Sequence, residues 1–160
     1  MRKDAGVDGD AQRISQLGWM LFLKIFDEKE NDWEITNDNY KSPIPKDLRW
    51  RSWAADEEGM TGDQLLGFVN NSLFPRLKEL KLRNNKDAAL MVKDVFEDSY
   101  NYMKSGTLLR QVINKINSGI QLTSKATAML LMIFTSKYFA TCKVQVMPVS
   151  FIHHVPLHNL

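Results

Sequence analysis

Aromatic and basic side chains stand close together between positions 46 and 53, a mixture that can contact nucleic acid. Trp50 and Trp53 lie beside Lys46, Arg49 and Arg51. Lysine and arginine neutralise phosphates, and tryptophan rings stack on bases. A plainer alternative is that the tryptophans anchor a long loop on the protein while the charges face solvent. We predict Arg49 and Arg51 as DNA-facing residues and leave the anchoring interpretation open.

A second basic stretch follows between positions 78 and 86. It contains Lys78, Lys81, Arg83 and Lys86. Cations near the carboxyl end of a helix also interact favourably with its dipole, which offers a purely local explanation. On charge clustering alone, we add Lys78, Lys81 and Arg83 to the predicted DNA-facing residues.

No catalytic or metal-binding constellation stands out in the chain. The stretch 6–9 has no preceding strand and matches no phosphate-binding loop. The acidic run 56–58 suits a solvated face, because consecutive positions diverge in space. His153, His154 and His158 lack nearby carboxylates or thiolates that would complete a zinc site. We therefore predict no catalytic residues, no metal site and no cofactor in this chain.

Helical periodicity dominates the elements that would position these side chains. A helix is expected to begin at positions 8–10 and to end in the polar run 27–32. Its apolar residues recur at spacings of three and four, at Ile14, Leu17, Leu21 and Ile25. A loop should follow over 34–45, and a short helix or turn over 46–55.

Further helical segments fill the chain up to position 117. Thr61 and Gln64 have the spacing of a capping box, and Pro75 should kink or split the helix that follows near residues 73–74. Residues 87–102 and 108–116 predict two more helices. Because no segment before position 117 alternates convincingly as a strand, the sequence predicts an all-α helical bundle.

The composition is that of an ordinary globular protein, with 44% hydrophobic residues, 25% charged residues and a net charge of +2. Such a charge does not by itself indicate a nucleic-acid-binding protein. The single cysteine, Cys142, excludes an internal disulfide and fits a reducing cytoplasm. The most apolar run, 126–134, is too short to span a bilayer. We expect a cytoplasmic protein with no membrane partner.

The character of the sequence changes at about Asn117. Every acidic residue lies at or before Asp98, whereas residues 118–160 hold the cysteine and all the histidines. We divide the chain into a helical domain over 1–117 and an atypical tail over 118–160. The tail should form a helix over 122–138 and then an irregular segment.

Four stretches of the helical domain resemble one known family. They are residues 1–30, beginning MRKDAGVDGDAQRISQLGWM; IPKDLRW over 44–50; TGDQLLGFVN over 61–70; and MKSGTLLRQVINKIN over 103–117. All four are similar to the N-terminal domain of the modification subunit of type I restriction–modification systems. The resemblance covers about the first three quarters of the chain.

The resemblance implies a function for a larger parent subunit. In this family the helical domain precedes a domain that binds S-adenosylmethionine and methylates adenine N6 in DNA. Two modification subunits assemble with one specificity subunit, and the helical domain contributes subunit contacts and helps to enclose DNA. The family's catalytic motif, of the Asn-Pro-Pro-Phe type, is absent from the 160 residues, so no activity is expected of this chain alone.

A one-base shift of the reading frame restores the family pattern in the tail. Read one base earlier, codons for 132–138 permit Asp-Ile-Tyr-Glu-Gln-Ile, and codons for 148–157 permit Gly-Glu-Phe-Tyr-Thr-Pro-Arg. Both segments follow the helical domain in the family, so we interpret 118–160 as translated out of frame in a truncated subunit. Apolar surface exposed by this truncation should favour self-association. The alternative is a free-standing helical interaction or regulatory protein with a functional tail.

Overall fold

The computed structural model describes residue 1, residues 3–82 and residues 85–119. Within these residues the protein is helical and contains no strand, so the prediction of an all-α bundle is confirmed. The helix and irregular segment predicted for the tail lie outside the described residues. None of the described helices is long and apolar enough to cross a membrane.

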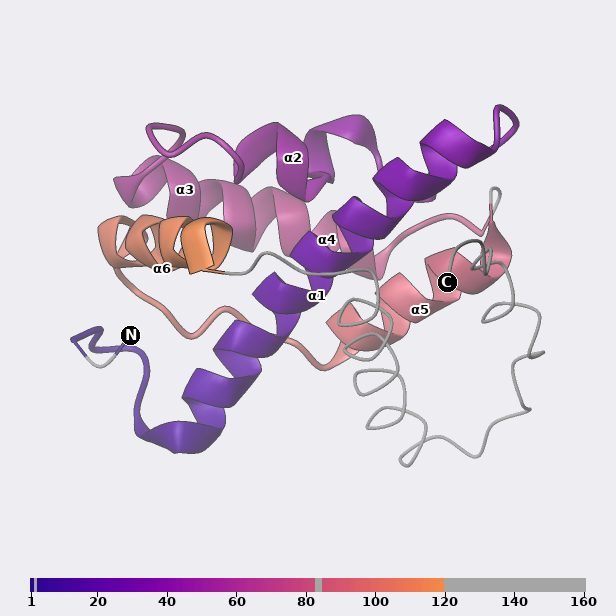
Figure 1. The fold of residues 1–160 in the computed structure, drawn as a ribbon. Coiled ribbons are helices and arrows are strands. Elements are labelled where there is room, and N and C mark those ends of the chain that lie inside the picture. Colours follow the sequence, from indigo (N-terminus) through magenta and orange to yellow (C-terminus); the bar gives the residue numbers. More distant parts are fainter. Residues whose placement is uncertain (2, 83–84, 120–160) are drawn as a thin grey trace, which may run out of the picture.

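The longest element is helix α1 (Gly9–Thr36), which runs diagonally across the bundle in Figure 1. Its start agrees with the sequence prediction, but the expected end in the polar run 27–32 is wrong. The helix continues because Asp27, Glu30 and Glu34 recur at spacings of three and four on one face. That face packs against Tyr40 and Arg51, which are distant in sequence.

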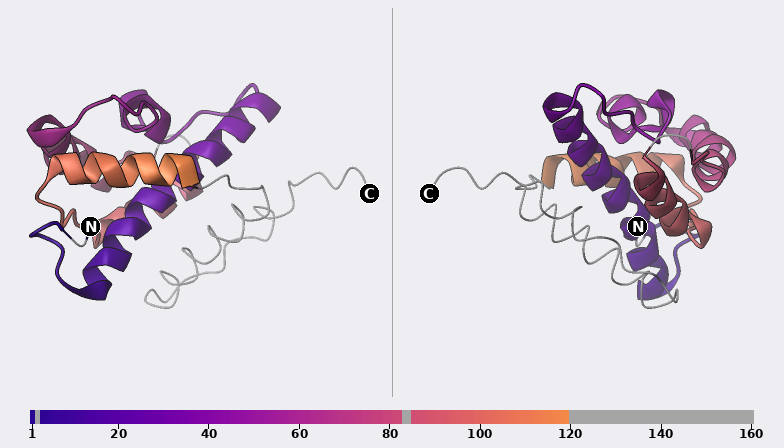
Figure 2. Two further views of the ribbon diagram at one scale, coloured as in Figure 1. Left: turned by 60° about the vertical axis from the view of Figure 1, so that its left-hand side comes forward. Right: turned by 90° about the vertical axis from the view of Figure 1, so that its right-hand side faces the viewer.

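The remaining elements fold back around α1 (Figures 1 and 2). In chain order they are the 3-10 turn η1 (Lys46–Leu48), α2 (Trp50–Trp53), α3 (Gly62–Phe68), the π-helical η2 (Val69–Leu73), α4 (Phe74–Lys78), α5 (Lys86–Glu97) and α6 (Gly106–Gly119). Helix α2 packs on α1, α3 on α6, and α4 on α5. The short helix predicted to carry the two tryptophans is therefore present.

The helix is divided between residues 73 and 74, where the sequence predicted that Pro75 would kink or split it. In a regular α-helix the proline ring would clash with the carbonyl of Asn71 and leave it without a donor. The chain instead forms the π-helical η2, in which the Phe74 N–H bonds to the Val69 carbonyl. Helix α4 then begins with the proline in its first turn, where a missing N–H costs little.

The capping box predicted at Thr61 does not form. The Thr61 hydroxyl makes no capping hydrogen bond to the first turn of α3. The next residue, Gly62, has a φ of +57°, outside the right-handed helical region, which redirects the first-turn amides.

Gly62 and Gly106 let helices α3 and α6 approach closely. A Cβ added to Gly106 would lie 1.8 Å from the Gly62 carbonyl oxygen, well inside van der Waals contact. A Cβ added to Gly67, in the same helix α3, would meet nothing nearer than 4.0 Å. The contact between α3 and α6 therefore depends on the missing side chain at one specific position.

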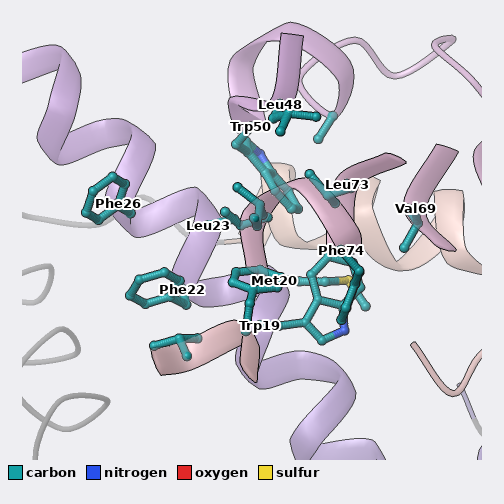
Figure 3. Close-up of a cluster of buried hydrophobic side chains, with 14 of the residues drawn as sticks. Trp19, Met20, Phe22, Leu23, Phe26, Leu48, Trp50, Val69, Leu73 and Phe74 are labelled. Atoms are coloured by element: carbon teal, nitrogen blue, oxygen red, sulfur yellow. The ribbon is translucent and has the colours of Figure 1, made fainter. Parts of the chain in front are cut away.

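Aromatic rings fill the centre of the bundle (Figure 3). Trp19 of α1 meets Phe74 of α4 edge-on, with ring centroids 5.1 Å apart, and Phe74 meets Phe96 of α5 at 5.2 Å. Trp50 and Trp53 are also buried, with centroids 5.3 Å apart. Burial of these rings supports the anchoring interpretation, because neither tryptophan is exposed for stacking on a base.

Two polar side chains of α6 hold the tryptophan helix in place. The Arg110 side chain is buried and donates to the carbonyls of Met60 (2.7 Å) and Trp53 (3.1 Å), among others. Asn117 accepts a hydrogen bond from Trp50 Nε1 at 2.9 Å and donates to the Ala54 carbonyl at 2.7 Å. The end of α6 is thus joined to α2 by hydrogen bonds as well as by packing.

Helix α5 ends at Glu97, five residues earlier than the sequence predicted. Residues 98–105 instead form an irregular connection to α6, and their backbone is held by side chains from the start of the chain. The buried Asp4 carboxylate accepts from the backbone N–H groups of Lys104 (3.0 Å) and Ser105 (2.9 Å). Distant acceptors therefore satisfy amides that a longer helix would have satisfied locally.

Candidate nucleic-acid interface

Arg49 and Arg51, two of the predicted DNA-facing residues, lie at the junction of α1 and α2 and pair with carboxylates there. Arg51 donates through Nε to Asp27 at 2.9 Å and through Nη1 to Glu34 at 3.0 Å. Arg49 donates through Nη1 to the other oxygen of Glu34 at 2.7 Å. Both guanidinium groups are thus neutralised within the bundle. Their role in fastening α2 to α1 is enough to explain why arginines occur at these two positions, without any contact to DNA.

The same junction contains a buried acid, Glu30, which is fully excluded from solvent. One of its oxygens accepts a hydrogen bond from the Tyr40 hydroxyl at 2.9 Å, and the other has no hydrogen-bond partner. Burial raises the pKa of Glu30 above its ordinary value, although the nearby Ser42 and Tyr40 hydroxyls and the charge of Arg49 oppose the shift. Burial and the neighbouring Glu30 likewise raise the pKa of the Tyr40 phenol.

Replacing Glu30 by glutamine should stabilise the protein at neutral pH by about 1 kcal/mol, since it removes a buried charge with an unsatisfied oxygen. The raised pKa means that the folded state holds this proton more tightly than the unfolded chain. Stability from Glu30 is therefore present below the ordinary pKa of 4.5 and is lost as pH rises through the folded-state value. Urea titrations of parent and Glu30→Gln at pH 4.5 and pH 7.5 measure the difference. An equal effect at both pH values would contradict the expectation.

Lys78 and Lys81 lie at and beyond the end of α4, in a different environment from the arginines. The Lys78 ammonium donates to the Glu97 carbonyl at 3.0 Å and sits 4.7 Å from the centroid of the Tyr100 ring. Lys81 is exposed. Arg83, the fifth predicted residue, lies outside the described residues. Neither of the two lysines pairs with a carboxylate among the described residues.

Tyr100, which lies beside Lys78, and the hydrogen-bonded pair of Asn70 and Asn101 were missed by the sequence analysis. Asn101 donates to Asn70 Oδ1 at 2.9 Å, and Tyr100 lies edge-on to Tyr102 with centroids 6.5 Å apart. The sequence prediction placed 98–102 in a helix, where consecutive side chains point in different directions. It therefore gave no reason to expect these side chains on one surface. The sequence did contain a signal that α5 ends earlier, because Asp98 and the two tyrosines that follow it are poor helix formers.

Arg110 is a second residue whose role the sequence analysis missed. It precedes the buried Ile113 by three positions and therefore falls on the apolar face of α6. An arginine on an apolar face must find acceptors within the protein, and the carbonyls around α2 supply them. This spacing was the signal that could have identified Arg110 as an internal anchor.

Comparisons with known proteins identify the family of this chain. The family model described as "HsdM N-terminal domain" matches residues 1–116. The chain is 62% identical over 118 residues to the type I restriction enzyme EcoEI methylase subunit of Escherichia coli. That alignment covers 73% of this chain but only 24% of the methylase subunit.

A solved structure has the same fold. It is the crystal structure of a modification subunit of a putative type I restriction enzyme from Vibrio vulnificus YJ016, with a TM-score of 0.70 and 33% sequence identity. The match covers 88% of this chain and 32% of that one. The resemblance found in the sequence is confirmed, and the chain belongs to the family of HsdM N-terminal domains, the helical domains that open type I modification subunits.

Proposed function

We propose that this chain acts as the N-terminal helical domain of a type I modification methyltransferase, supplying contacts to partner subunits and to DNA. The partners would be a specificity subunit, a second modification subunit and the DNA duplex. The parent enzyme would methylate adenine N6 with S-adenosylmethionine, and the cofactor would bind in the domain that follows the helical one. No catalytic role is assigned to any residue of this chain.

One observation carries the proposal: the 62% identity to the EcoEI methylase subunit extends over 118 residues. The structure offers a reason why such a long segment is similar. Its core draws on every helix from α1 to α6, so the segment behaves as one folding unit. A unit of this kind can be exchanged between related subunits without cutting through a core.

A domain exchange tests the proposed function. We expect that replacing the aligned segment of the EcoEI methylase subunit by residues 1–118 of this chain gives a subunit that still methylates DNA. The chimera should need its specificity subunit and S-adenosylmethionine, as the parent enzyme is expected to. Transfer of a radiolabelled methyl group to a duplex containing the recognition site provides the measurement.

A destabilised chimera is the negative control. A second chimera carrying Gly106→Ala in the exchanged segment should lose assembly and methylation together, because the contact between α3 and α6 is disrupted. A well-folded first chimera that binds the specificity subunit but methylates no faster than background would contradict a DNA-contact role. Failure of a well-folded chimera to bind the specificity subunit would contradict the subunit-contact role.

The domain boundary near position 117 stays a prediction. Three observations support it: the family model ends at residue 116, the alignment with the EcoEI methylase subunit spans 118 residues, and Asn117 still bonds to α2. Translation of 118–160 in a shifted frame is likewise our proposal. The nucleotide sequence from codon 117 onward tests it, since the proposal requires the shifted codons to be present.

A further inference from the structure

Four side chains from three elements form two neighbouring pairs, which we call together the Tyr100 patch: Lys78 of α4 with Tyr100, and Asn70 of η2 with Asn101, where Tyr100 and Asn101 are consecutive residues of the connection 98–105. The Lys78 ammonium lies over the Tyr100 ring at 4.7 Å, and Asn101 bonds to Asn70 at 2.9 Å. Tyr100 is 58% exposed, among the most exposed large apolar side chains of the described residues. Asn70 is exposed as well, whereas Lys78 and Asn101 are half-buried.

The irregular backbone under the patch is held rigidly by buried side chains. Gln16, which has no solvent exposure, accepts from the Tyr102 N–H at 2.8 Å and donates to Asn101 Oδ1 at 2.9 Å. Gly6 allows close packing from the other side, since a Cβ there would lie 2.0 Å from the Tyr102 carbonyl. A rigidly supported loop can bind a partner without first losing conformational freedom.

Lys78 and Tyr100 are the members of the patch that suit an anion, because the Asn101 amide already donates to Asn70 and to the Met103 carbonyl. Arg13, Arg49, Arg51 and Arg76 all pair with carboxylates, and Arg110 is buried against carbonyls. Lys78, by contrast, forms no ion pair within the part of the chain that the structure describes. Lysine, tyrosine and asparagine side chains are all common donors to phosphate oxygens in protein–DNA interfaces.

We propose that the Tyr100 patch contacts the phosphate backbone of duplex DNA. Lys78 supplies the charge, the Tyr100 hydroxyl donates to a phosphate oxygen, and the Asn70–Asn101 pair flanks the contact. Because none of these groups reads a base edge, the contact is independent of sequence. The proposal rests on the proposed function. Of the residues predicted from the sequence it keeps Lys78, leaves out Arg49 and Arg51, and adds the connection after α5.

Fluorescence anisotropy with the full 160-residue chain and a labelled 30-base-pair duplex tests the patch, measured across a salt series. Lys78→Gln should weaken binding and reduce the slope of log affinity against log salt by about one. Tyr100→Phe removes only the hydroxyl, so it should weaken binding about tenfold and leave the slope unchanged. Circular dichroism confirms that both variants are folded.

Lys115→Gln is the matched control, because Lys115 is an exposed lysine on α6 outside the patch. It should bind DNA as the parent chain does. If Lys78→Gln and Lys115→Gln weaken binding equally, or if Tyr100→Phe binds like the parent, the patch is not the contact even though the chain binds DNA. If the parent chain shows no DNA binding at low salt, the DNA role within the proposed function fails as well, whereas methylation by the domain-exchange chimera would still support the subunit role.

Discussion

Gly106→Ala is expected to lower the free energy of unfolding by about 3 kcal/mol, a large effect for the addition of one methyl group. The new Cβ would stand 1.8 Å from the Gly62 carbonyl oxygen, which is backbone and cannot rotate away. Helices α3 and α6 must then separate, and the side chains packed between them lose contact. Urea unfolding followed by tryptophan fluorescence gives the difference in free energy.

Gly67→Ala is the matched control for this substitution. It makes the same chemical change within α3, where the added Cβ meets nothing nearer than 4.0 Å. Alanine is the better helix former, so Gly67→Ala should leave stability unchanged or raise it by about 0.5–1 kcal/mol. Similar stabilities for the two variants would show that α3 and α6 do not approach as closely as described.

Replacement of Arg110 by methionine should cost about 3 kcal/mol of stability, because it leaves buried carbonyls without donors. Its guanidinium group donates to the carbonyls of Met60 at 2.7 Å, Asp56 at 3.1 Å and Trp53 at 3.1 Å. Among the described residues, no other donor bonds to the Met60 and Trp53 carbonyls, whereas Asn117 also donates to Ala54 and Asn114 donates to Glu57. Urea unfolding monitored by circular dichroism at 222 nm measures the loss.

Two further variants define the origin of this loss. Arg110→Lys keeps the charge but not the planar fork of donors, so we expect it to recover little of the stability. Lys115→Met removes an exposed charge from the same helix and should change stability by less than about 0.5 kcal/mol. Full stability of Arg110→Lys would mean that charge, and not the number of hydrogen bonds, holds the segment.

The sequence was sufficient to predict the fold class and most helix positions. Periodic apolar residues identified α1 and α6, and the start of α1 is where the acidic and glycine residues at 8–10 placed it. Both errors at helix ends came from tertiary contacts. Helix α1 extends past Asp27 because distant arginines pair with its polar face, and α5 stops early because Asp4 and Gln16 stabilise the irregular chain after it.

The candidate site was less accessible to sequence reasoning. Arg49 and Arg51 look available when only their neighbours are considered, but their carboxylate partners lie 15 to 24 positions earlier in the chain. Asn70 and Asn101 come together across 31 positions. Charge clustering therefore finds candidate residues, whereas only the fold reveals which cations have already been neutralised.

The number of residues in the π-helical turn before Pro75 sets the orientation of α4 relative to α3. Each residue of a helix turns the next one by about 100°, so losing one residue from η2 would rotate everything that follows relative to α3. Phe74 and Leu77, now buried, would turn outward and Arg76 would turn inward. Substitutions can accumulate in this segment during evolution, but insertions and deletions there would be selected against.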